Sequence, residues 1–129
     1  MIEKEYTPNK QALKLKDLNF NVPCLLGFCL DGSNEYVKSD SLNGENFNVF
    51  DLYVSIPSFS QVFRWFREKY NLEVSFYRTM ETIEGLKYGY QIERWESETT
   101  EDLVNLYEKS YEEAELACLK KLIEIVKLK

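Results

Sequence analysis

A stripe of apolar residues at helical spacing runs through the middle of the chain. Its members are Phe59, Val62, Phe63, Phe66 and Tyr70. Spacings of three and four residues place side chains on one side of an α-helix, so the stripe predicts a helix with one buried face. Ser58 or Ser60 supplies the N-cap and Asn71 a suitable C-terminal stop, which places the helix between them.

The last part of the chain has a second helical pattern. Ser110 and Glu113 form a capping box, in which each side chain bonds the backbone N–H of the other residue. One broad apolar arc of this helix is formed by Ala114, Cys118, Leu119, Leu122, Ile125 and Val126. A shorter helix is expected near the start, with Thr7 as N-cap, Pro8 in the first helical position and an end near Asp17.

Short apolar or alternating runs between these helices predict strands. Residues 24–30 are continuously apolar and end at Asp31-Gly32, which favours a buried strand and a tight turn into a return strand at 35–38. Alternation over residues 47–54, stopped by Pro57, predicts a third strand. Residues 72–80 and 88–96 alternate on either side of a turn near Glu84-Gly85, so we expect an antiparallel hairpin there.

Two polar segments connect these elements. Residues 39–48 have the composition of a surface loop or a wide hairpin turn. Residues 97–109 are interpreted as a short helix capped by Thr100 or as a loop. The whole order predicts an α+β fold, with an antiparallel sheet of four to five strands and about three helices packed mainly on one face.

Length and composition limit the number of domains and the class of protein. A chain of 129 residues that is 44% hydrophobic and 15% aromatic can bury one core and is short for two, so we expect a single globular domain over residues 1–129. Its first residues have no apolar core of a signal peptide and no run is long enough to cross a membrane. We therefore expect a cytoplasmic protein with no membrane partner.

The distribution of charge narrows the choice of partners. The net charge of −6 disfavours attraction to phosphate backbones, and residues 91–115 hold nine acids against two bases, a local charge of −7. This acidic stretch is a solvated face or a surface that imitates nucleic acid. A nucleic-acid-associated protein, the alternative function, would need a local basic surface formed by Lys10, Lys14, Lys16, Arg64 and Arg67.

The sequence contains no catalytic signature. Histidine is absent, which removes the commonest proton-transfer group and metal ligand. The three cysteines have no metal-binding or redox spacing and are interpreted as structural thiols, while Asp31, Asp40 and Asp51 follow no ligand pattern. We expect no catalytic residue, no cofactor and no metal. An enzyme built from carboxylates is a further, less favoured alternative.

Trp65 is the residue that most suggests a protein interface. It lies off the apolar stripe of its helix, and it is either covered by its own chain or an anchor for a partner, since Trp and Arg dominate interface energetics. The candidate interface residues are Trp65, Gln61, Glu68, Arg64, Arg67, Glu98, Glu101 and Asp102. The partner would be an unidentified protein, and a homodimer is compatible with the pattern.

Three segments resemble a family of small uncharacterised proteins of bacteriophages, prophages and mobile elements of gut bacteria. They are the Thr-Pro-x-x-x-Ala-Leu-x-Leu-Lys-x-Leu-x-Phe pattern of residues 7–20, residues 57–70 with their Phe-Arg-Trp-Phe-Arg-Glu-Lys-Tyr core, and residues 111–127. The resemblance covers roughly half of the chain and transfers no residue role. It implies an intracellular accessory protein, and with the absence of catalytic signatures it favours a non-enzymatic protein that binds another protein.

Overall fold

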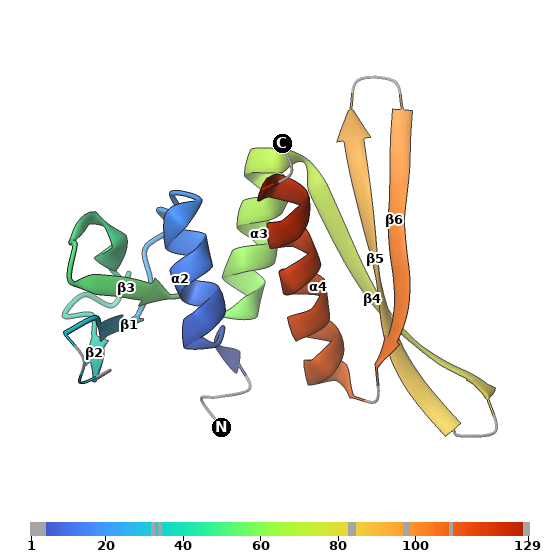
Figure 1. The fold of residues 1–129 in the computed structure, drawn as a ribbon, viewed down its shortest axis with the longest axis horizontal. Coiled ribbons are helices and arrows are strands. Elements are labelled where there is room, and N and C mark those ends of the chain that lie inside the picture. The colour runs from blue at the N-terminus through green and yellow to red at the C-terminus, as the bar shows by residue number, and fades with distance from the viewer. Residues whose placement is uncertain are drawn as a thin grey trace. The chain divides into compact units, whose positions relative to one another are not determined.

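The computed structural model describes residues 5–31, 33, 35–82, 85–96, 99–108 and 110–127. They divide into two compact units, the N-terminal unit Met1–Val62 and the C-terminal unit Phe63–Lys129. Within the described residues each unit has a three-stranded antiparallel sheet (Figure 1). The predicted α+β class is confirmed. The single sheet of four to five strands is wrong, because the strands pair within each unit. The single domain stays a prediction.

The sheet of the N-terminal unit consists of β1 (Leu26–Cys29), β2 (Tyr36–Lys38) and β3 (Tyr53–Ile56), in the order β2-β1-β3. The predicted pairing of the first two strands is confirmed, although residue 32 of the predicted turn lies outside the described residues. Leu26 lies opposite Lys38 on one side and Ile56 on the other. Since strand side chains alternate between faces, these three residues form one row across one face of the sheet.

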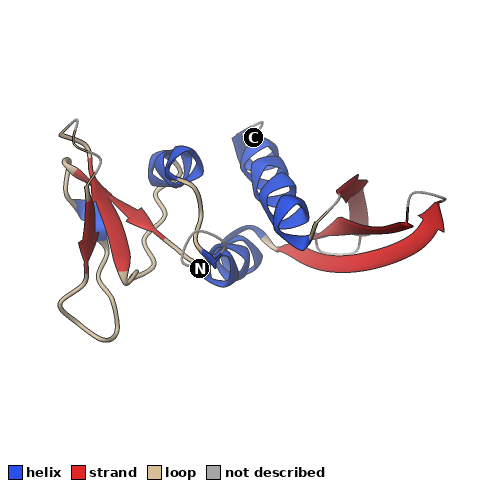
Figure 2. Cartoon of the chain, turned by 90° about the horizontal axis from the view of Figure 1, so that it is seen from below, coloured by secondary structure: helices blue, strands red, loops and turns tan. Residues whose placement is uncertain are grey.

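Helix α2 (Asn9–Asp17) covers this face of the sheet (Figure 2). The buried cluster between them consists of Ala12, Phe28, Val54 and Ile56, against which Tyr6 and Leu26 pack partly buried. The predicted first helix is therefore confirmed. Its main strand contacts are with β3, which lies at the opposite edge of the sheet from β2.

The third strand begins later than predicted. Residues Phe47–Val49 form the short 3-10 helix η1, and β3 starts only at Tyr53. The Asn46 side chain accepts a hydrogen bond from the Asn48 N–H at 3.1 Å, and Asn48 in turn accepts from the Ser55 N–H at 2.9 Å. Such local side-chain bonds offer the backbone an alternative to strand pairing. They explain why the prediction of a strand from residue 47 is wrong.

Thr7 does not cap α2, contrary to expectation. The N-cap is Pro8, which has no side-chain cap hydrogen bond. The Thr7 N–H instead donates to the Pro57 carbonyl oxygen at 3.0 Å, and Tyr6 forms an antiparallel bridge with Ser58. The segment before the helix is thus held extended against the end of β3, which turns the Thr7 side chain away from a capping role.

Helix α3 (Phe59–Tyr70) spans the boundary between the two units. At its start Ser58 and Gln61 form a reciprocal cap: the Gln61 N–H donates to Ser58 Oγ at 3.2 Å, and the Ser58 N–H donates to Gln61 Oε1 at 3.0 Å. At its end Asn71 has a φ of 56°, the left-handed conformation of a helix stop. Both predicted boundaries are confirmed.

The C-terminal unit contains β4 (Leu72–Thr82), β5 (Gly85–Glu96) and β6 (Thr99–Glu108) in that order across the sheet. The predicted hairpin is confirmed, although residue 84 of its turn lies outside the described residues. Residues 99–108 are a strand, so both interpretations of the segment 97–109 were wrong. A register shift places Leu103 opposite Ile92 and Leu106 opposite Tyr90. The two leucines have a helical spacing of three and nevertheless lie in a strand, because the strand contains a bulge or irregularity.

Helix α4 (Tyr111–Lys127) lies along this sheet and makes more contacts with β5 than with β4 or β6 (Figure 2). The Glu113 N–H donates to Ser110 Oγ at 3.2 Å, which confirms the predicted cap. The buried residues of α4 are Ala114, Cys118, Leu119, Leu122, Ile123 and Ile125. None of the described helices is long and apolar enough to cross a membrane.

Candidate functional site

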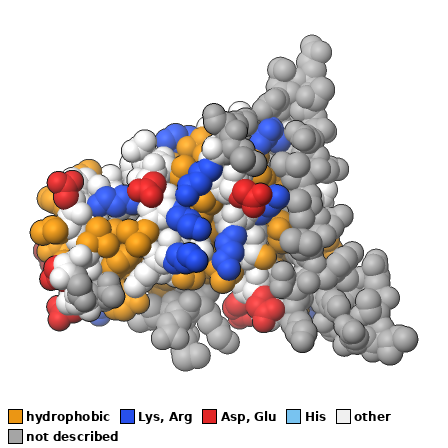
Figure 3. Space-filling view, viewed as in Figure 1, with side chains coloured by type: hydrophobic (Ala, Val, Ile, Leu, Met, Phe, Trp, Pro, Cys, Tyr) orange, Lys and Arg blue, Asp and Glu red, His pale blue; other side chains and the backbone are white. Residues whose placement is uncertain are grey.

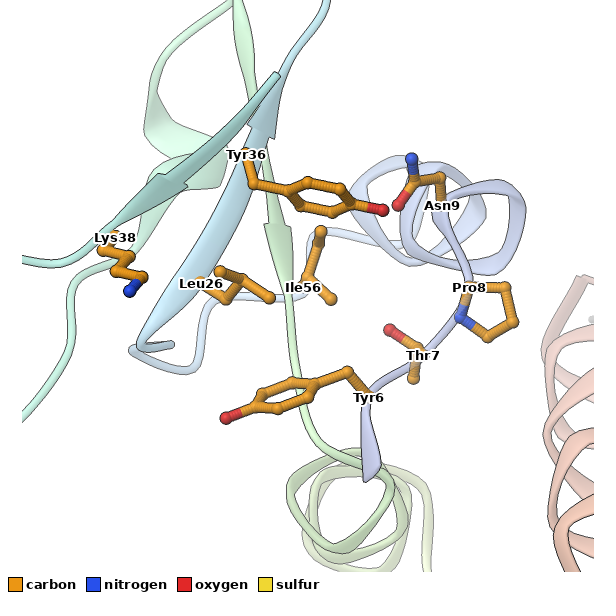
Figure 4. A pocket seen from close by; sticks show the side chains of 8 residues that line it. All are labelled: Tyr6, Thr7, Pro8, Asn9, Leu26, Tyr36, Lys38 and Ile56. Carbon is orange, nitrogen blue, oxygen red and sulfur yellow. The ribbon is translucent and has the colours of Figure 1, made fainter. Parts of the chain in front are cut away.

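The N-terminal unit contains an open pocket of about 720 Å³ on the face of its sheet. Its lining residues are Tyr6, Thr7, Pro8, Asn9, Leu26, Tyr36, Lys38 and Ile56. They come from two parts of the unit: the extended segment that leads into α2, and the three strands (Figure 4). Pockets of 300 to 1,000 Å³ that are lined mainly by apolar groups are typical of ligand sites.

The strand register explains the floor and one wall of the pocket. Leu26 and Ile56 lie side by side on β1 and β3, and Lys38 continues the same row on β2. Tyr36 comes two residues before Lys38 and therefore shares its face. It is 62% exposed. An exposed tyrosine on a sheet face next to buried aliphatic residues leaves an apolar recess beside its ring.

The segment Tyr6–Asn9 forms the opposite wall. Figure 4 shows the Tyr6 and Tyr36 rings on either side of Leu26 and Ile56, with Thr7 and Pro8 at one end and Lys38 at the other. The hydrogen bond from the Thr7 N–H to Pro57 fixes this wall against β3.

Thr7 carries an unusual polar group for its position. The residue is only 3% exposed, and its Oγ1 has no hydrogen-bond partner among the described residues. A buried hydroxyl without a partner costs roughly 1–3 kcal/mol, so native proteins rarely keep one without a reason. Here the residue lines a pocket, where a ligand can supply the missing partner.

The electrostatics of the pocket favour an anion. Lys38 is the one lining residue that is charged at neutral pH. At the other end, α2 begins with Pro8 as its N-cap, has no side-chain cap and has no acidic residue in its first turn. The partial positive charge of a helix N-terminus is therefore not offset by a side chain of this first turn.

The predicted anchor Trp65 lies elsewhere and is buried. It is 6% exposed and packs edge-on against Phe66 and Tyr70, with ring centroids 5.1 and 5.4 Å apart. The Lys69 Nζ lies 5.1 Å from the Trp65 ring centroid. The structure thus agrees with the interpretation that its own chain covers Trp65. Its role as an interface residue stays a prediction.

The polar candidates on α3 have partners within their own unit. Gln61 donates from Nε2 to the Pro23 carbonyl oxygen at 3.0 Å, in addition to its role in the cap. Arg64 pairs with Glu68 at 2.8 Å, and Arg67 lies 3.9 Å from a Glu73 carboxylate oxygen. Both ion pairs are exposed, and pairs of this kind contribute little stability. These residues do not line the pocket.

The acidic candidates fall on or next to β6. Glu98 lies outside the described residues, while Glu101 and Asp102 lie on the strand opposite Arg94 and Glu93. Nothing here tests their role at an interface. Of the basic residues named for the alternative function, Lys16 donates from Nζ to the Phe50 and Tyr53 carbonyl oxygens at 2.7 and 2.6 Å. That alternative stays a prediction.

The other reactive side chains have structural surroundings. All three cysteines are free thiols. Burial raises the pKa of the Cys24 thiol to about 12 and also raises the pKa of Cys118, so neither is an activated nucleophile. A hydrogen bond from the Ser33 side chain lowers the pKa of Asp31. The described residues contain no group of three or more Cys, Asp or Glu placed to hold a metal ion.

One carboxyl group in the C-terminal unit is strongly perturbed. Partial burial, and next the charge of Glu112, raise the pKa of Glu115 to about 7. Its neighbours one turn away on α4 are Tyr111 and Cys118, whose pKa values are raised first by burial and next by the charge of Glu115. A raised pKa is a feature of functional sites and also of partly buried structural carboxyls. The pocket in the N-terminal unit brings several lining residues together around one recess, and Glu115 is not one of them.

Sequence reasoning missed most of the pocket. No sequence pattern marks Tyr6, Tyr36 or Lys38 as binding residues. The sequence predicts Thr7 as a helix N-cap and not as part of a pocket. The available signal was the alternation of Tyr36 and Lys38, which places both on one face of a return strand. That signal does not show which part of the face the helix leaves open.

The comparisons with known proteins give no further guide. No protein-family model matches the chain, and neither the curated proteins nor the solved structures contain a match. The resemblance to phage and mobile-element proteins therefore stays a prediction.

Proposed function

We propose that this chain is a non-enzymatic accessory protein that binds another protein through the pocket of its N-terminal unit, in the phage or mobile-element setting that the resemblance implies. The observation that carries the proposal is the open apolar recess between Tyr6 and Tyr36, floored by Leu26 and Ile56. Recesses of this kind accept the bulky apolar side chains that anchor protein interfaces.

The lining residues favour binding over catalysis. They include no carboxylate and no thiol, two of the commonest kinds of proton acceptor and nucleophile in enzymes that have no histidine. The surrounding surface also suits a protein partner. Apolar side chains are exposed on this unit (Figure 3). Leu25 and Leu30, which flank β1, and Tyr36 on β2 are exposed. Apolar surface around a recess increases the area that a partner can bury.

The test is a selection of short random peptides on the full chain, with the library made both with free carboxyl ends and with amidated ends. Peptides that bind the pocket should be lost on the Tyr36→Ser variant, which removes one aromatic wall. They should be retained on Leu42→Ser. Leu42 is 98% exposed in the same unit and does not line the pocket, so this change is a matched control for surface apolarity.

Two further variants address the other candidate contacts. Trp65→Ala and charge reversal of Glu101 and Asp102 should leave pocket-directed peptides bound, provided that each variant folds by circular dichroism. Selected peptides that bind wild type and Tyr36→Ser equally, or that are lost with the Trp65 or acidic variants instead, would refute the pocket as the contact.

A further inference from the structure

We propose that the pocket recognises the carboxyl-terminal end of its partner, an apolar residue with a free α-carboxylate. This inference rests on the proposed function and names the group that enters the site. The Thr7 hydroxyl donates to a carboxylate oxygen at the inner end. The apolar side chain lies between the Tyr6 and Tyr36 rings on Leu26 and Ile56.

Hydrogen-bond donors lie at the Thr7 end of the pocket. The Thr7 hydroxyl is buried and lacks an acceptor, and the helix that follows has an uncapped N-terminus. Helix N-terminal N–H groups and a nearby hydroxyl together form a typical carboxylate or phosphate site. Because the Thr7 backbone is fixed by its bond to Pro57, the position of this donor in the unit is defined.

The rest of the pocket selects between carboxylate and phosphate. A phosphate group is hydrophilic on every side, whereas this recess has aromatic and aliphatic walls next to its donors. An apolar carboxylate satisfies both parts, with its polar end at Thr7 and its apolar body against the floor. Lys38, at the opposite end, adds attraction for a negative ligand without direct contact with the carboxylate (Figure 4).

The size of the pocket favours a peptide end over a single small group. A volume of about 720 Å³ lies in the range of drug-sized ligands, so it holds more than one side chain. A chain terminus offers the carboxylate, the last side chain and the preceding residue in one ligand. The pocket is open to the surface, which lets the remainder of such a partner leave it.

The experiment uses three defined probes on the full-length chain. They are acetyl-Ala-Ala-Phe with a free carboxylate, the same peptide with a carboxyl-terminal amide, and 3-phenylpropionate. Affinities come from titrations followed by two-dimensional NMR, which also shows whether Thr7, Asn9, Leu26 and Ile56 respond. We expect the free acid to bind at these residues at least about tenfold more tightly than the amide, since a hydrogen bond to a charged group is worth that factor or more.

The variants isolate the two polar contributions. Thr7→Val has nearly the same shape and should weaken the free acid at least about tenfold while leaving the amide unchanged. Thr7→Ser should restore preference for the acid. Lys38→Gln should weaken the acid about two- to fivefold and reduce its salt dependence. Lys120→Gln makes the same charge change on an exposed residue of α4 and should have no effect.

Each other outcome overturns a defined part of the reasoning. Equal binding of acid and amide at the pocket residues would reject the carboxylate and leave the proposed function standing. If 3-phenylpropionate binds as tightly as the peptide acid, the ligand is a small carboxylate and the protein terminus is rejected. If no probe shifts the pocket residues while selected peptides still bind there, this inference fails alone; if neither binds there, the proposed function fails with it.

Discussion

Replacing Thr7 by valine should make the N-terminal unit more stable, although the residue is buried and polar. Threonine and valine have nearly the same shape and are both branched at Cβ, so the change creates no cavity. The difference is the hydroxyl, which has no partner and is almost fully removed from water. Removing its desolvation cost should raise the free energy of unfolding by about 1–2 kcal/mol.

The assay must report on the correct unit. Trp65 and Trp95 both belong to the C-terminal unit, so tryptophan fluorescence does not follow the change. Amide hydrogen exchange reports on the stability of the N-terminal unit. The Ala12 N–H bonds to the Pro8 carbonyl oxygen at 2.9 Å, and the Leu30 N–H bonds to Leu52 at 2.7 Å, both in the N-terminal unit. In Thr7→Val these amides should exchange about 5 to 30 times more slowly if they exchange through unfolding of the unit.

Thr7→Ser is the matched control. It keeps the hydroxyl and deletes a buried methyl group, so it should destabilise the unit by roughly 1 kcal/mol. Faster exchange in Thr7→Val than in wild type would refute the reasoning, because it would mean that the hydroxyl has a partner in solution, such as a bound water, whose loss costs more than the desolvation relieved.

Three other changes follow from particular contacts. A Cβ added at Gly27 would lie 2.9 Å from a backbone carbonyl oxygen and from ring carbons, so Gly27→Ala should destabilise the N-terminal unit by about 1–3 kcal/mol, measured by the same hydrogen exchange. The pKa of Glu115 is raised to about 7 from 4.5, so between these values the folded state holds a proton that the unfolded state releases. The free energy of unfolding of the C-terminal unit should therefore fall as the pH rises through this window, and Glu115→Gln should abolish that slope in urea titrations followed by tryptophan fluorescence. A thiol reagent at pH 8 should modify Cys29, which is half-buried, well before Cys24 and Cys118, and mass spectrometry of the digested chain checks the order.

Local signals in the sequence predicted the helices well. The cap of α3 uses Ser58 and Gln61, and Asn71 ends the helix in a left-handed conformation. These features depend on residues within a few positions of each other, so the sequence contains everything needed to infer them. The same is true of the cap at Ser110 and of the hairpin β4–β5.

The errors arose where distant residues decide the structure. Leu103 and Leu106 have helical spacing, yet the register shift against β5 places both in a strand. Asn46 and Asn48 replaced the start of a predicted strand by a 3-10 helix through side-chain bonds that include Ser55. The division of strands into two sheets likewise depends on which strands pair, and alternation alone does not specify a partner.

The pocket depends both on local sequence signals and on contacts between distant residues. This explains why the sequence predicted the elements around the pocket and missed the pocket itself. Thr-Pro at 7–8 is a correct sign of a helix start, but the bond from Thr7 to Pro57 holds the threonine extended and leaves its hydroxyl unpaired. The same contact that prevents the cap thus creates a donor beside an uncapped helix. If Thr7→Val stabilises the unit and also weakens the carboxylate probe, the cost of the unpaired hydroxyl is linked to binding, since natural proteins retain destabilising groups mainly where function uses them.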